Sequence, residues 1–135
     1  MARTALLVAA TLACGLLVPT PAPGQPVPMV GEICPRGYWP KRSYCVPIAK
    51  DARPAVPRVG NECPFMYDRD GAYCLGPRRG RHAVLRNESC PTGYHRRGPY
   101  CVGGPGEPPT IAKKNFCPDA YESTVGEYCA PKRRR

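Results

Sequence analysis

The sequence predicts a small, disulfide-rich protein: four tandem, disulfide-closed β-hairpin units joined by Pro/Gly/Arg-rich linkers, with little hydrophobic core. Eight of the nine cysteines fall into four evenly spaced pairs, and Pro and Gly contribute 19 and 14 of the 135 residues. A Pro and Gly content near one quarter disfavours a regular packed domain. Beyond residue 24, Leu, Ile, Val and Phe number only 15 of 111 residues. That is too few for an α/β enzyme domain or a helical bundle to bury a core.

Residues 1–24 have the features of a secretory signal peptide, which we expect to be removed after Gly24. Arg3 supplies a positive charge, Thr4–Val18 is an unbroken apolar and small-residue run, and small residues and prolines follow. The run is shorter than the roughly 20 apolar residues that a membrane-spanning helix needs. We therefore expect a secreted or periplasmic protein. The alternative is a lipoprotein cleavage box in which Cys14 is acylated and anchors the chain.

The other eight cysteines lie in four copies of one motif: Cys-Pro-x-x-Tyr, five or six residues, then Tyr-Cys. The copies begin 29, 27 and 27 residues apart, a regularity that identifies an internal repeat. In an exported protein such an even, regularly spaced set indicates disulfides. We expect pairing within each copy, with bridging between copies as the alternative. The expected pairs are Cys34–Cys45, Cys63–Cys74, Cys90–Cys101 and Cys117–Cys129.

Each copy is predicted to be a β-hairpin whose two cysteines lie opposite each other. In the first copy this would place Pro35 against Tyr44, a favourable cross-strand contact. The fourth copy is one residue longer, and we expect the extra residue in its turn. The turns are expected at Trp39-Pro40, Asp68–Gly71, Arg96–Gly98 and Ser123–Gly126. Each disulfide would contribute roughly 3 kcal/mol in the chain-entropy model and would replace a core.

The motifs divide the chain into ten segments. The linkers show neither a helical stripe nor a sustained alternation, so we expect them to be extended, with room for short strands around Ala55-Val56 and Ala83–Leu85. The predicted segments are a signal peptide (1–24), a Pro-rich lead-in (25–33), repeats at 34–45, 63–74, 90–101 and 117–129, linkers at 46–62, 75–89 (basic) and 102–116, and a basic tail (130–135).

Two resemblances concern this motif. Cys-Pro-x-Gly-Tyr, six residues and Cys, as at Cys34 and Cys90, resembles the C-terminal loop of an epidermal-growth-factor-type module. The four further cysteines of that module are missing, so the likeness is local and implies no receptor or calcium function. The chain after residue 24 is also similar to small bacterial secreted proteins with tandem Cys-Pro-x-Gly-Tyr…Tyr-Cys units, which implies export and disulfides but no activity. Met66 and Ala120 replace the motif glycine, and a positive φ there would strain these copies.

The sequence offers little for catalysis, and we predict no enzyme, no cofactor and no metal site. His82 and His95 are the only histidines, and no nucleophile elbow, zinc-protease helix motif or phosphate loop is present. Structural zinc sites usually bring two ligands two to four residues apart, whereas paired cysteines here are separated by ten or eleven residues.

Positive charge is the strongest indication of a partner. Without Arg3 the chain has 19 basic and 10 acidic residues, a formal charge of +9. Clustered cations on a rigid scaffold favour polyanions. The alternative is that the arginines only keep a protein with little core in solution. The predicted partners are anionic polysaccharide, a phosphorylated lipid surface or extracellular nucleic acid. The residues predicted to bind them are Arg78, Arg79, Arg81, His82, Arg96, Arg97, Lys113, Lys114, Lys132, Arg133, Arg134 and Arg135.

The eight tyrosines all occupy the two motif positions. We expect them to pack against proline and the disulfides. The alternative is an exposed aromatic row that stacks on sugar or base rings or is crosslinked by oxidation. The repeat aromatics are Tyr38, Tyr44, Tyr67, Tyr73, Tyr94, Tyr100, Tyr121 and Tyr128.

Composition, motifs and charge together predict a secreted, basic, non-enzymatic repeat protein. It would act as a binding module on anionic envelope or extracellular polymers. The first alternative is a structural coat or matrix component crosslinked through disulfides or tyrosines. A cationic antimicrobial effector is a further alternative, although no amphipathic helix supports it.

Overall fold

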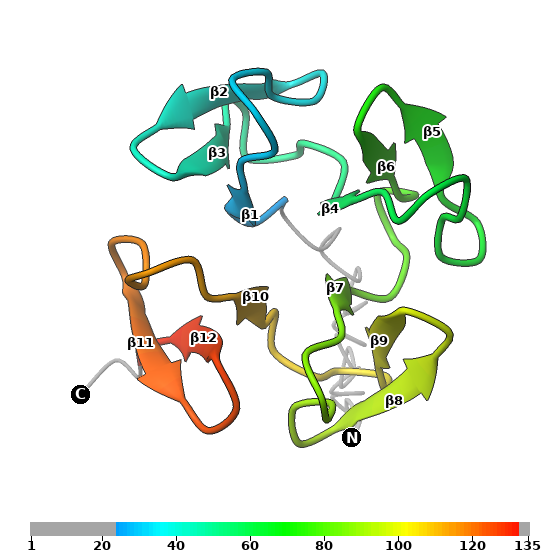
Figure 1. Ribbon diagram of the computed structural model, residues 1–135, viewed down its shortest axis with the longest axis vertical. Helices are drawn as coiled ribbons and strands as arrows, with labels where there is room; N and C mark the ends of the chain where they lie inside the picture. The colour runs from blue at the N-terminus through cyan, green and yellow to red at the C-terminus, as the bar shows by residue number, and fades with distance from the viewer. Residues whose placement is uncertain (1–23, 133–135) are drawn as a thin grey trace, which may run out of the picture.

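The computed structural model describes residues 24–132. The predicted signal peptide apart from Gly24, including Cys14, and Arg133–Arg135 lie outside the described residues. Within residues 24–132 the chain forms twelve short β-strands and no helix, arranged as four three-stranded antiparallel sheets. The sheets stand around a common centre like the blades of a small β-propeller, and we call them blades 1 to 4 (Figure 1).

Each blade consists of one hairpin and one strand from the segment that precedes it. The hairpin's second strand lies in the middle of the sheet, and the preceding strand pairs with it at the centre of the molecule. The strands are β1 (Val27–Pro28), β2 (Tyr38–Lys41) and β3 (Tyr44–Pro47) in blade 1, β4 (Ala55–Pro57), β5 (Asp68–Asp70) and β6 (Tyr73–Leu75) in blade 2, β7 (Ala83–Leu85), β8 (Tyr94–Arg97) and β9 (Tyr100–Gly103) in blade 3, and β10 (Ile111–Ala112), β11 (Tyr121–Thr124) and β12 (Tyr128–Pro131) in blade 4.

The predicted fold class is therefore confirmed, and the four disulfides pair within each repeat as expected. The bonds are Cys34–Cys45, Cys63–Cys74, Cys90–Cys101 and Cys117–Cys129. The linker strands expected around Ala55-Val56 and Ala83–Leu85 exist as β4 and β7. The inner strands β1 and β10 were not expected, because two residues are too few to show a period in sequence.

The expectation that paired cysteines lie opposite each other in the hairpin is wrong. Cys45 lies opposite Pro40 of β2 and Val27 of β1, and Tyr44 lies opposite Lys41 rather than Pro35. The reason is a β-turn directly after Cys34, closed by a hydrogen bond from the Tyr38 N–H to the Pro35 carbonyl. The disulfide therefore ties this turn to the middle strand.

The same turn follows the first cysteine of every repeat and requires a left-handed residue at its third position. Gly37 and Gly93 have φ of 82° and 84° there, whereas Met66 and Ala120 adopt 69°. This is the geometry of a type II turn, which favours glycine at that place. The two non-glycine copies accordingly carry the expected strain.

The hairpin turns lie nearer the second cysteine than the sequence suggested. Three hairpins close with two residues, at Arg42-Ser43, Gly71-Ala72 and Gly98-Pro99, and the fourth closes with Val125–Glu127. The extra residue of the fourth repeat is thus in the turn, as expected. Strands instead contain most of the residues expected in the turns: Trp39-Pro40, Asp68–Asp70, Arg96-Arg97 and Ser123-Thr124. The reason is that the turn after the first cysteine occupies the residues that were expected to begin the first strand of each hairpin.

The four inner strands close a ring around the centre of the molecule. β1 contacts β4, β4 contacts β7, β7 contacts β10, and β10 returns to β1. Val27, Val56, Val84 and Ile111 are buried there. The pocket lined by the inner strands has a volume of only about 10 Å³, which is room for no more than about one water molecule. The buried residues form four small hydrophobic clusters, and each cluster lies between two neighbouring blades.

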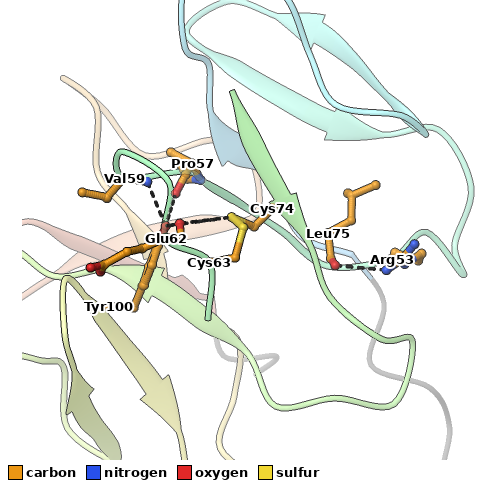
Figure 2. The surroundings of a disulfide bond; sticks show 8 residues. All are labelled: Arg53, Pro57, Val59, Glu62, Cys63, Cys74, Leu75 and Tyr100. Atoms are coloured by element: carbon orange, nitrogen blue, oxygen red, sulfur yellow. Dashed lines mark hydrogen bonds between the residues drawn. A yellow bond between two sulfur atoms is a disulfide. The ribbon is translucent and has the colours of Figure 1, made fainter. Parts of the chain in front are cut away.

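The second tyrosine of each motif joins its blade to the preceding one. The Tyr100 hydroxyl of blade 3 enters the turn of blade 2, where it accepts a hydrogen bond from the Val59 N–H and donates to the carbonyl of Pro57 or Glu62, each at 2.9–3.0 Å (Figure 2). Tyr73 bridges Val30 and Ile33 of blade 1 in the same way, at 2.7 Å to each. We call these contacts tyrosine latches.

The first and last repeats are joined by the same latch. Tyr44 of blade 1 accepts a hydrogen bond from the Lys114 N–H of blade 4 at 2.8 Å and donates to the Phe116 carbonyl. Tyr128 of blade 4 latches onto Asn87 and Ser89 of blade 3. The four latches therefore run around the ring without a break. They were not predictable from the motif, because their partners are backbone groups of another repeat.

Candidate functional site

A cleft of about 830 Å³ lies between blades 2 and 3, a volume typical of small-molecule sites. Its walls combine apolar side chains with three arginines. We call it the arginine cleft, and it is lined by Pro64, Phe65, Met66, Tyr67, Pro77, Arg79, Gly80, Arg81, Ala83, Arg97 and Val102.

One wall is the turn that follows Cys63. Phe65 and Met66 occupy its two central positions, so their side chains project away from the blade and are 92% and 65% exposed. Tyr67 ends the turn and points its hydroxyl at the linker, where it donates to the Arg81 carbonyl at 2.9 Å. This bond, with the Pro77–Gly80 turn, positions the arginines of the linker against the apolar wall.

Arg81 can be compared with Arg53, its counterpart one repeat earlier, because the carbonyl of each accepts the first tyrosine hydroxyl of its repeat. The Arg53 guanidinium makes three hydrogen bonds: it donates to the Gly76 and Leu75 carbonyls and to the Asp68 carboxylate, the last at 2.8 Å.

In blade 3 the position of Asp68 is occupied by His95. Asp68 lies opposite Leu75 and His95 opposite Val102, so the two residues are equivalent in register. Among residues 24–132 no hydrogen bond or ion pair engages the Arg81 guanidinium. Loss of the acidic partner therefore leaves this cation free at the cleft.

Arg97 shows a second departure from the repeat. At the seam between blades 1 and 2, Arg36 pairs with Asp70 (3.8 Å), and at the seam between blades 4 and 1 the same two positions hold Asp119 and Lys41 (3.4 Å). Between blades 2 and 3 those positions hold Phe65 and Arg97.

Arg97 has no ion-pair partner within residues 24–132. Glu62 approaches the neighbouring Gly98 but makes no ion pair with Arg97. Arg79 is likewise without an ion-pair partner within residues 24–132. Among the residues that the structure describes, the cleft thus gathers three guanidinium groups without an ion-pair partner.

The other residues predicted to bind polyanions lie elsewhere or are already engaged. Arg78 pairs with Asp51 at 3.1 Å, Arg96 donates to the Glu88 carbonyl, and Lys114 donates to the Met29 carbonyl. Lys113 is half-buried and Lys132 is exposed, and neither lines the cleft. Arg133, Arg134 and Arg135 lie outside the described residues.

His82 differs from the other residues of this set because it is buried. Its side chain is 8% exposed, its Nδ1 has no hydrogen-bond partner in the described structure, and burial lowers its pKa. The imidazole is therefore neutral at pH 7, and His82 adds no positive charge to the cleft.

The tyrosines form no exposed aromatic row. The four latch tyrosines are at most 2% exposed, Tyr38 and Tyr94 are also buried, and Tyr67 and Tyr121 are half-buried. Burial raises the pKa of Tyr67 and Tyr73, so their hydroxyls remain protonated donors. The hypothesis of exposed rings available for stacking or crosslinking has no support here.

Sequence reasoning selected Arg79, Arg81 and Arg97 but missed Phe65 and Met66. A comparison of the repeats could have found Phe65: the second residue after the first cysteine is Arg36, Phe65, Thr92 or Asp119, and only one of these is apolar. Within residues 24–132 no group of three or more His, Cys, Asp or Glu side chains could hold a metal ion. The described part of the chain also contains no helix that could span a membrane.

No known protein family matches the chain, and neither the curated proteins nor the solved structures contain a significant match.

Proposed function

We propose that this protein is a secreted or periplasmic, non-enzymatic binding module that recognises anionic groups of envelope or extracellular polymers at the arginine cleft. The observation that supports the proposal is that Arg79, Arg81 and Arg97 have no ion-pair partner within residues 24–132. At the corresponding positions two of the other three seams carry an ion pair, and the third, between blades 3 and 4, holds the uncharged Thr92 and Thr124. Guanidinium groups bind phosphate, sulfate and carboxylate through paired, charge-assisted hydrogen bonds.

The scaffold also supports a binding role. Four disulfides and a closed ring of tyrosine latches hold the cleft walls in place before a ligand arrives. Preorganisation of this kind reduces the ordering cost of binding. Three like charges in one cleft repel each other in the free protein, and an anion would relieve that repulsion.

The alternative, a crosslinked coat or matrix component, finds less support. The eight cysteines within residues 24–132 pair internally, and the latch tyrosines are buried. Neither set is free to form intermolecular links. The alternative still predicts covalent multimers under non-reducing conditions.

Retention on immobilised heparin, measured against sodium chloride concentration, tests the proposal. The test variant is Arg79→Gln/Arg81→Gln/Arg97→Gln. The matched control is Lys50→Gln/Arg69→Gln/Lys132→Gln, which removes three positive charges from exposed positions outside the cleft. Salt should weaken retention of the wild type, because charge contacts with a polyanion release counterions.

The cleft variant should elute at clearly lower salt than the control variant. If both variants lose retention equally, net charge alone explains binding and the cleft is not the site. Salt-independent retention of the wild type would contradict the proposal as a whole.

A further inference from the structure

We propose that the arginine cleft takes a single-chain anionic amphiphile, dispersed as a monomer, whose apolar chain lies on Phe65 and Met66 and whose phosphate or carboxylate head binds Arg79, Arg81 and Arg97. The inference rests on the proposed function and narrows its ligand to one chemical class.

The first argument is the composition of the walls. Besides the arginines, the lining side chains are proline, Phe65, Met66, Tyr67, alanine and valine. The Tyr67 hydroxyl is already bonded to the Arg81 carbonyl. The cleft therefore offers an anion three charged donors and offers the rest of the ligand hydrocarbon surface only.

This composition disfavours the other two predicted partners. A polysaccharide presents hydroxyl groups along its length, and burying them against hydrocarbon without hydrogen bonds is unfavourable. A single-stranded nucleic acid needs a series of aromatic platforms for successive bases, and the cleft exposes one, Phe65. An alkyl chain needs no polar partner and gains from burial.

The second argument is the exposure of the apolar wall in the free protein. Phe65 is 92% and Met66 65% exposed, although the equivalent positions in blade 1 hold Arg36 and Gly37. The backbone of Met66 also has a left-handed φ of 69°, a conformation that Gly37 adopts without strain at the equivalent position. A flexible thioether adapts to irregular apolar ligands, so this residue suits a chain-binding wall.

The third argument is size. The cleft of about 830 Å³ lies in the range of sites that enclose small molecules, and it is bounded by two blades rather than being a flat face. A dispersed single-chain amphiphile fits such a space better than the plane of a bilayer does.

The test is calorimetric titration of the disulfide-intact protein with dodecyl phosphate below its micellar concentration. Inorganic phosphate and dodecyl maltoside serve as the head-only and chain-only probes. Dodecyl phosphate should bind with a stoichiometry near one and about tenfold or more tighter than either probe, because only it uses both walls. Equal affinity for inorganic phosphate would overturn the proposal.

Two variants separate this inference from the proposed function. Phe65→Ser/Met66→Gly should weaken dodecyl phosphate binding about tenfold or more and leave heparin retention unchanged. The arginine triple variant should both weaken dodecyl phosphate binding and elute from heparin at lower salt. The matched control Ile48→Ser/Val125→Ser alters residues that are 69% and 93% exposed outside the cleft, and it should alter neither.

The remaining outcomes contradict one or both proposals. Unchanged dodecyl phosphate binding in the Phe65/Met66 variant refutes the amphiphile alone. Tighter binding of oligo(dT), lost in the same variant, would identify base stacking instead. Binding to phosphatidylglycerol vesicles without binding of monomeric dodecyl phosphate would identify a bilayer as the partner. If the arginine variant retains every ligand, both proposals fail.

Discussion

Replacing Tyr44 by phenylalanine removes the single hydroxyl that latches blade 4 to blade 1 and leaves the ring otherwise intact. The hydroxyl accepts a hydrogen bond from the Lys114 N–H at 2.8 Å and donates to the Phe116 carbonyl, and the tyrosine is 1% exposed. Each of the two backbone groups loses a hydrogen bond worth about 1 kcal/mol net. The free energy of unfolding of the variant should therefore be about 2 kcal/mol lower than that of the wild type.

The matched variants are Tyr73→Phe and Tyr100→Phe, which remove the same latch between consecutive repeats. In a closed ring, all three substitutions should cost similar amounts. The assay is guanidinium-induced unfolding at equilibrium with the disulfides intact, followed by far-ultraviolet circular dichroism. A loss of about 2 kcal/mol is large against the stability of a small domain and is readily measured.

The comparison refutes the ring if Tyr44→Phe is neutral while Tyr73→Phe and Tyr100→Phe are destabilising. That pattern would mean that the first and last repeats do not meet. If all three variants are neutral, water replaces the hydroxyl groups, and the latches contribute no stability.

Three further predictions concern backbone strain and titration. Gly37→Ala should destabilise the protein by about 1 kcal/mol and Ala120→Gly should stabilise it by up to about 1 kcal/mol, because both positions have positive φ. Thermal unfolding measures both effects, and two substitutions that shift stability equally and in the same direction would contradict the prediction. Burial raises the pKa of Tyr67 and Tyr73, so in the folded protein their hydroxyl groups should stay neutral as the pH rises through 10. An absorbance titration in which every tyrosine ionises near pH 10 while the fold persists would refute this prediction. Burial lowers the pKa of His82, so the unfolded chain binds a proton more readily than the folded chain, and stability falls as the pH drops below about 6.5. His82→Gln should make stability less dependent on pH in this range. An unchanged pH dependence in the variant would show that His82 is not its cause.

Much of the local structure could be predicted from the sequence because the motif carries its own turn chemistry. The spacing of cysteines predicted the four disulfides, and the variation at Met66 and Ala120 predicted strained turns. The hairpin register could not be predicted, because a cysteine pair alone does not show that Pro35 begins a turn rather than a strand.

The ring and the cleft depend on contacts between repeats, which the sequence shows only indirectly. The partners of Tyr44 are backbone groups about seventy residues away, and any residue type can supply them. The arginines were identified because they cluster in the sequence. Phe65 can be recognised as a residue of the site only once the fold places it beside Arg97 of the next blade. Charge is therefore visible in the sequence, whereas its lack of a partner is visible only in the structure.

The packing of repeats is the central claim, because the walls of the arginine cleft come from two blades and the ring fixes them. The Tyr44 and Phe116 rings lie edge to face with centroids 6.0 Å apart, although the residues belong to the first and last blades. The most direct measurement is a nuclear Overhauser spectrum of the disulfide-intact protein. Cross-peaks between the Tyr44 and Phe116 ring protons are expected for the closed ring. Their absence, with the contacts inside each hairpin preserved, would show four separate units and contradict the account.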